Sequence, residues 1–305
     1  MSGATDRLRR RVGRVRTQRG PALVDAGLAA LPTLLAVSLG VVPLVLLFVE
    51  SVSPPVTIEN YAALGGSVYP EIMIRSLGIG VAVTLVCLTV AYPVTYWLAH
   101  RCPGRYRLPV LVSFTLPLWL NYVVLNYTWV WILASDGVVN AVLTGLGVVD
   151  RPLDLLRTAS AVGVGPLELP GLSLGLGFVH IYLPYVLLTM YVSMERLDYR
   201  QVEAARDLGA GDLRVFLDVV VPETYAGAVA GALIVYARIA GAFATPQILA
   251  APAEQMIAQI ITTQFYDVLD YPFAAALSVA FLAVVLVGFG IGALSTDVRA
   301  ALKRW

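Results

Sequence analysis

A lone arginine in an apolar segment stands out among the side chains that could do chemistry. Arg238 lies in IVYARIAGAFATP, near the middle of the predicted fifth membrane span, 225–249. A charge at that depth is costly and is rare without a function. No carboxylate lies three or four residues away on the same helix. Three interpretations stay open: a structural arginine capping carbonyls at an interface, one lining a water-filled path, and one snorkelling from a misplaced span boundary.

A polar stripe is predicted in the third span, 108–133. Four residues recur there on one helical face, at spacings of three, four and three: Trp119, Tyr122, Asn126 and Trp129. Aromatic residues near span ends typically form interfacial belts, whereas Asn126 favours a polar cavity or a helix–helix hydrogen bond. In the fourth span, 173–193, Tyr182 and Tyr185 flank Pro184, where a kink would open a local cavity.

The sequence offers no set of groups for catalysis inside the membrane. An intramembrane enzyme needs a nucleophile with a base, a metal cluster or paired carboxylates, and the predicted spans hold none. Only two histidines occur, His100 and His180, so no metal site is expected. Cys87 and Cys102 are predicted at different membrane depths, so a structural disulfide is not expected either.

Six long apolar segments must position these side chains. Of the 305 residues, 58% are hydrophobic and only 13% charged, too few to cover a soluble core of this size. A transmembrane helix takes about 20 apolar residues. Six segments reach that length and are too long and uniform for barrel strands: 27–49, 76–98, 108–133, 173–193, 225–249 and 272–294. The sequence therefore predicts an all-α integral membrane protein with a six-span domain, 27–294.

The charges predict the orientation of the spans. Basic residues gather in the arm 1–26, the loop 100–107, the stretch 196–214 and the tail 295–305, all on one side of a six-span chain. Acidic residues dominate the other side: Glu50, Glu59, Glu71, Asp136, Asp150, Asp154, Glu254, Asp267 and Asp270. Because basic loops stay inside, both termini are predicted to be cytoplasmic. The arm is expected to bind anionic lipid headgroups of the bilayer, and no nucleic acid.

A charged, helix-prone stretch, QVEAARDLGAGDLRVFLDVVVPET, separates the fourth and fifth spans at 201–224. A helix is predicted to begin near Tyr199, with Asp198 as its cap. Gly209 permits a turn that other residues resist, and Asp212 can cap a second short helix. Such a helix–turn–helix is either an amphipathic linker on the membrane surface or a docking site for a soluble partner.

The spacing within this stretch resembles a known signature. EAA at 203–205, Gly209 after three residues and VVVP at 219–222 after nine resemble the EAA motif (E-A-A, x3, G, x9, I-x-L-P) of ATP-binding-cassette importer permeases. EAARDLGA at 203–210 is similar to the E-A-A-x-D-L-G-A of the spermidine/putrescine-type branch. Further stretches resemble that branch at 92–99, 114–124, 136–156, 181–198, 243–265 and 271–278.

The resemblance implies a non-catalytic permease subunit of a type I importer in a prokaryotic inner membrane. Its partners would be an ATPase dimer, a second permease that is a related but different chain, and an extracytoplasmic solute-binding protein. The loop 198–222 would hold the ATPase-coupling residues: Glu203, Ala204, Ala205, Asp207, Leu208 and Gly209. No cofactor is expected here, since the chain has no Walker A pattern and ATP with Mg would belong to the partner ATPase.

The translocation path and its solute are less defined by the sequence. Candidates to line the path are Arg238, Asn126, Tyr122, Trp129 and Tyr185. Where the branch often has Gly-Asp-Phe, this chain has GAF at 241–243, and LNYTW at 125–129 replaces the branch's Arg-Thr-Tyr-Ala-Trp. Polyamine-like, amino-acid-like and small organic anion solutes therefore all stay open.

Two other functions compete with the permease. A secondary transporter usually needs more helices, internal repeats and intramembrane acids, which this sequence lacks. One sequence feature separates a permease from a non-transport membrane subunit: in such a subunit the loop 198–222 would have no coupling function.

Overall fold

The computed structural model describes residues 21–52, 56–65, 68–156, 163–164, 167–168 and 170–295. Most of the basic arm and nearly all of the tail lie outside the described residues, so the predictions about them stay predictions. The elements are α2 (Pro21–Ser51), α3 (Glu59–Gly65), α4 (Tyr69–His100), α5 (Gly104–Thr115), η1 (Leu116–Trp119), α6 (Tyr122–Leu133), α7 (Val138–Gly145), β1 (Gly163–Val164), β2 (Leu167–Glu168), α8 (Leu172–Glu195), α9 (Tyr199–Asp207), α10 (Asp212–Val215), η2 (Phe216–Val220), α11 (Val221–Ala240), α12 (Ala244–Leu249), α13 (Ile257–Thr263), η3 (Gln264–Val268) and α14 (Tyr271–Ser295).

The predicted all-α membrane architecture is confirmed. In the part of the chain that the structure describes, six helical segments are long and apolar enough to cross a bilayer: Pro32–Ser51, Tyr69–His100, Tyr122–Gly145, Leu172–Glu195, Asp212–Ala240 and Tyr271–Gly288. β1 and β2 form a small antiparallel hairpin that pairs Gly163 with Glu168.

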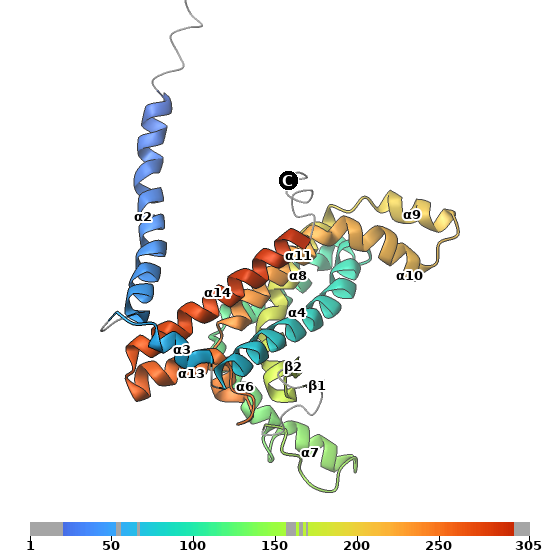
Figure 1. Ribbon diagram of the computed structural model, residues 1–305. Helices are drawn as coiled ribbons and strands as arrows, with labels where there is room; N and C mark the ends of the chain where they lie inside the picture. Colours follow the sequence, from blue (N-terminus) through green and yellow to red (C-terminus); the bar gives the residue numbers. More distant parts are fainter. Residues whose placement is uncertain are drawn as a thin grey trace, which may run out of the picture.

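The centre of the fold is a bundle of α4, α8 and α11, which pack against one another (Figure 1). Its interior is apolar, with Phe178, Met190 and Met194 of α8 and Val235 of α11 fully buried. Glycines on α11 let its backbone approach α8 closely, which is how helices associate in lipid, where water supplies no driving force between them.

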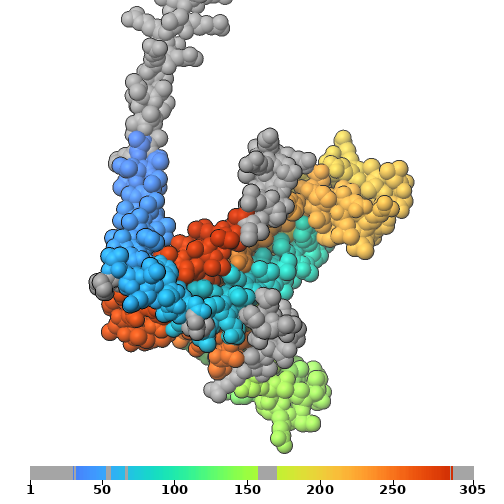
Figure 2. Space-filling view, in the orientation of Figure 1, coloured from blue at the N-terminus to red at the C-terminus, as the bar shows by residue number. Residues whose placement is uncertain are grey.

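Helix α2 stands apart from this bundle and meets α14 near its own C-terminal end (Figure 1). The space-filling view shows α2 rising clear of the body (Figure 2). Its apolar side chains are accordingly exposed, as with Leu34, Leu39 and Phe48. Such a surface suits lipid or another apolar helix.

The predicted third span, 108–133, is wrong as a single helix. α5 ends at Thr115, residues 116–119 tighten into the 3₁₀ turn η1, and Leu120 is extended. Asn121 then caps α6 by accepting a hydrogen bond from the Val123 amide at 2.8 Å. Pro117 has no N–H to continue a helical ladder, and asparagine favours a new helix start. Hydropathy registers neither effect.

The predicted fifth span, 225–249, is also broken. α11 ends at Ala240 and α12 begins at Ala244. Pro246 suits the first turn of a new helix but would disrupt the interior of a continuing one. Arg238 therefore lies in the last turn of α11 rather than near the middle of a span.

Candidate functional site

Helices α9 and α10 project from one end of the bundle (Figures 1 and 2). α9 begins at Tyr199 as predicted, and the Asp198 carboxylate accepts a hydrogen bond from the Arg200 amide at 3.1 Å. α9 ends at Asp207 with Leu208 as its C-cap, and Gly209 follows with a φ of +84°. The Gly209 amide donates to the Arg206 carbonyl at 2.8 Å, and the Ala210 amide to the Ala205 carbonyl at 3.0 Å. This is a Schellman end, which requires the left-handed backbone that glycine supplies.

The prediction that Asp212 caps the second helix is wrong. Gly211 takes the N-cap position, and no described side chain caps that end. The Asp212 carboxylate instead pairs with Arg206 at 2.9 Å, and Arg206 also donates to the Tyr199 hydroxyl at 3.4 Å. The bond to Asp212 raises the pKa of the exposed Arg206 guanidinium. The ion pair between Arg206 and Asp212 holds α9 and α10 together across the turn.

The projection has an anchored underside and an exposed tip. Val202 and Val215 are buried and hold it to the bundle. The predicted coupling residues lie together on or beside the tip, where Ala205 is half-buried and the others are exposed: Glu203, Ala204, Ala205, Asp207, Leu208 and Gly209. Leu208 is 89% and Leu213 72% exposed. Large apolar side chains so fully exposed on a projection are typical of a contact surface.

The link from the projection into α11 holds a feature that the sequence analysis missed. Residues 216–220 form a π-helical turn, η2, in which the Val221 amide bonds to the Phe216 carbonyl. η2 leads directly into α11, whose first turn contains Pro222. Single π-turns often occur at functional sites, and nothing in local propensity predicts this one.

A second candidate site is a cavity of about 300 Å³ between η1, α6, α8 and the break after α11. Its polar lining residues include Tyr122, Tyr182, Tyr185, Arg238 and Thr245. The Arg238 guanidinium lies 4.5 Å from the centre of the Tyr185 ring, in a cation–π contact. The structure thus brings together three of the predicted path residues: Arg238, Tyr122 and Tyr185.

Asn126 and Trp129 do not line this cavity; they tie helices together. The buried Asn126 amide donates to the Thr245 hydroxyl at 3.0 Å. The Trp129 indole donates to Nδ1 of His180 on α8 at 3.0 Å. Of the two alternatives for Asn126, the structure favours the helix–helix hydrogen bond. Thr245 carried no sequence signal that would have assigned it to the cavity, whereas Tyr182 and Tyr185 flank the proline expected to open one.

Replacing Thr245 by valine should destabilise the fold by about 1–3 kcal/mol, because a buried amide then loses its acceptor. Oδ1 of Asn126 already has no hydrogen-bond partner among the described residues. Thermal unfolding of the purified subunit in mild detergent measures the effect. Thr245→Ser keeps the hydroxyl and should unfold near the wild-type temperature. Equal losses in both variants would contradict a role for this hydrogen bond.

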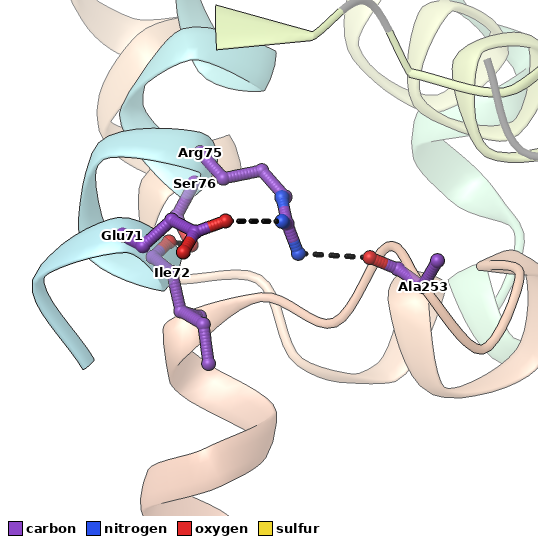
Figure 3. A network of polar contacts seen from close by, with 5 residues as sticks. All are labelled: Glu71, Ile72, Arg75, Ser76 and Ala253. Atoms are coloured by element: carbon purple, nitrogen blue, oxygen red, sulfur yellow. Dashed lines mark hydrogen bonds and ion pairs between the residues drawn. The ribbon is translucent and has the colours of Figure 1, made fainter. Parts of the chain in front are cut away.

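A polar network that the sequence did not predict lies at the start of α4, at the end of the bundle away from the α9–α10 projection (Figure 3). Arg75 of α4 pairs with Glu71 at 3.1 Å and donates to the Ala253 carbonyl at 2.8 Å. Next to it, the Ser76 hydroxyl accepts from the Ile257 amide at 2.8 Å. These contacts fasten the connection between α12 and α13 to the start of α4.

Glu254 extends this network to α8. Its carboxylate accepts from the Gly171 amide at 2.5 Å, at the N-cap of α8, and from the Ala251 amide at 3.3 Å. A carboxylate is favourable there because a helix N-terminus carries partial positive charge. Only 3% of Glu254 is exposed. In the sequence, Glu254 is one of several acidic residues predicted in loops on the same side of the membrane.

The fold and the two sites define a class: a membrane-embedded subunit with a polar cavity at a helix break and a projecting helix–turn–helix. Residues 91–300 match the family model described as "Binding-protein-dependent transport system inner membrane component". The chain therefore belongs to this family, the permease subunits of ABC importers, and is a multi-pass inner-membrane protein. The resemblance seen in the sequence is confirmed.

Named relatives and a solved structure agree with this assignment. The chain is 34% identical over 229 residues to the spermidine/putrescine transport system permease protein PotB of Salmonella typhimurium strain SL1344, covering 75% of each chain. It is 32% identical to the inner membrane ABC transporter permease protein YdcU of Escherichia coli K12, over 75% of this chain and 72% of that one. A bacterial alginate ABC transporter, solved with its alginate-bound periplasmic protein, matches with a TM-score of 0.71 at 16% identity, over 88% of this chain and 94% of that one.

Proposed function

We propose that this chain forms half of the path by which a small solute crosses the inner membrane, and that the α9–α10 projection couples this path to ATP hydrolysis on separate subunits. The exposed tip carries the proposal: Leu208 and Leu213 face outward from a loop anchored by buried valines. An apolar tip on a fixed base suits insertion into a groove of a soluble partner. The EAA spacing at the same residues indicates that this partner is an ABC ATPase.

The arrangement of the ends supports the orientation. The start of α2, the end of α14 and the α9–α10 projection all lie toward one end of the molecule, with α7 and the β1–β2 hairpin toward the other (Figure 1). In the sequence, basic residues gather in and next to the three elements at the first end, so we place that end in the cytoplasm. The α7 end would then receive the solute-binding protein.

A second permease subunit and an ATPase dimer complete the proposed assembly. The solved alginate transporter, with its periplasmic protein, supports a binding-protein partner for this chain. The PotB relatives are spermidine/putrescine permeases, so a polyamine is one candidate solute for this chain.

Replacing Leu208 by aspartate should reduce the ATPase that co-purifies with the tagged chain by at least about tenfold, since 1.4 kcal/mol of lost contact energy already gives that factor. The side chain is 89% exposed, so the fold should be unchanged. Extraction from the native host in mild detergent, with quantitative mass spectrometry, measures the ATPase.

Leu146→Asp is the matched control, because Leu146 is 74% exposed at the α7 end. This variant should retain the ATPase. If Leu208→Asp retains it as well, the projection is not the ATPase contact and the surface-linker interpretation returns.

A further inference from the structure

The charge of the cavity at the α11–α12 break is positive. Of the described residues that line it, Arg238 alone is charged. Its guanidinium contacts the Tyr185 ring at 4.5 Å, and it forms no ion pair with any described residue. An arginine held this way keeps its donors available, because the ring face supports the flat side of the guanidinium and leaves its edge free.

The position that would hold a compensating acid carries none. Ala242 lines the same cavity, and it stands where the spermidine/putrescine-type branch often has aspartate. Among the described lining residues, the other polar side chains carry hydroxyls: Tyr122, Tyr182, Tyr185 and Thr245. A hydroxyl can donate a hydrogen bond to an anion, and the charge of Arg238 attracts an anion and repels a polycation.

We propose that the solute carries a carboxylate, either a small organic anion or an amino-acid-like zwitterion, and that Arg238 binds this carboxylate during passage. The planar fork of arginine matches the two oxygens of a carboxylate. A cavity of about 300 Å³ lies at the small end of ligand sites. Tyr185 is a positioning residue that holds the guanidinium. The inference rests on the proposed permease function and assigns it a solute class other than the spermidine and putrescine of the PotB relatives.

Three probes of equal chain length test the charge preference: succinate with two carboxylates, γ-aminobutyrate with one, and putrescine with none. Each is titrated against the purified whole transporter in lipid nanodiscs, and the thermal unfolding midpoint of this chain is followed. Succinate or γ-aminobutyrate should raise that midpoint, and putrescine should not. A rise with putrescine, or none with either carboxylate, overturns the proposal.

Arg238 variants assign the effect to the cavity. In Arg238→Gln the carboxylate concentration for half the shift should rise at least tenfold, with an intermediate rise in Arg238→Lys, which keeps the charge but loses the fork. Arg214→Gln controls for general anion effects, since Arg214 pairs with Asp218 on the exposed projection. An unchanged response in Arg238→Gln, or loss of the folded subunit, would instead mean that Arg238 is structural. ATPase co-purification is read separately, so failure here leaves the permease function standing.

Discussion

Replacing Gly209 by proline should cut solute uptake at least about tenfold while the subunit still inserts and folds. The φ of Gly209 is +84°, and proline fixes φ near −65°. The substitution also removes the amide that bonds the Arg206 carbonyl at 2.8 Å. The turn between α9 and α10 must then rebuild, which moves Leu208 and separates Arg206 from Asp212. Under the proposed coupling role, a displaced tip would no longer fit the ATPase, so ATP hydrolysis should continue without solute movement.

Uptake and ATPase activity are measured together, in proteoliposomes containing the whole transporter. Gly211→Ala is the matched control, because the φ of Gly211 is −69° and any residue adopts it. That variant should transport normally. Glu203→Lys, which reverses a charge on the exposed face of α9, should uncouple as Gly209→Pro does. Normal uptake by a well-expressed variant combining the changes at Gly209 and Glu203 would remove the coupling assignment.

The helices were predictable from the sequence because lipid demands long apolar segments, and hydropathy measures that demand directly. Their breaks were not predictable in the same way. The interruption before Asn121 depends on a proline and a cap, and that before Ala244 on Pro246. Both lie within runs whose average hydropathy stays high, so a hydropathy profile continues across them. Arg238 was misplaced for this reason.

The conformation of the proposed coupling loop was more predictable than the cavity, because its determinants are local. The cap at Asp198 and the left-handed Gly209 act within one helical turn. Asp212 was the exception, since its partner Arg206 lies across the turn. The cavity depends on contacts between residues far apart in the chain: Thr245, which lines it, is held by a hydrogen bond from Asn126, 119 residues away. No periodicity within one helix shows such a contact.

The stability of the subunit should depend on two glycines where α11 crosses α8. A Cβ on Gly227 would lie 2.6 Å from the Thr189 carbonyl oxygen and 2.7 Å from Cβ of Ser193. One turn along, a Cβ on Gly231 would lie 3.1 Å from Cα of Val186. The two are spaced as Gly-x-x-x-Gly, the pattern that lets membrane helices approach most closely. Backbone atoms form part of both contacts, so the neighbours cannot give way by changing rotamer.

Gly227→Val should therefore abolish recovery of a folded, monodisperse subunit, whereas Gly227→Ala should lower its unfolding temperature measurably. Overpacking a tight interface costs about 1–3 kcal/mol, and more where the backbone must move. Gly40→Val in α2 is the control, because a Cβ there meets no atom of a described residue within 4 Å. A Gly227→Val subunit unfolding at the wild-type temperature would show that α8 and α11 do not pack through this face. Gly227→Val should remove fold and function together, whereas Gly209→Pro should leave a folded subunit that cannot transport. That contrast separates a glycine that packs the bundle from one that shapes the proposed coupling loop.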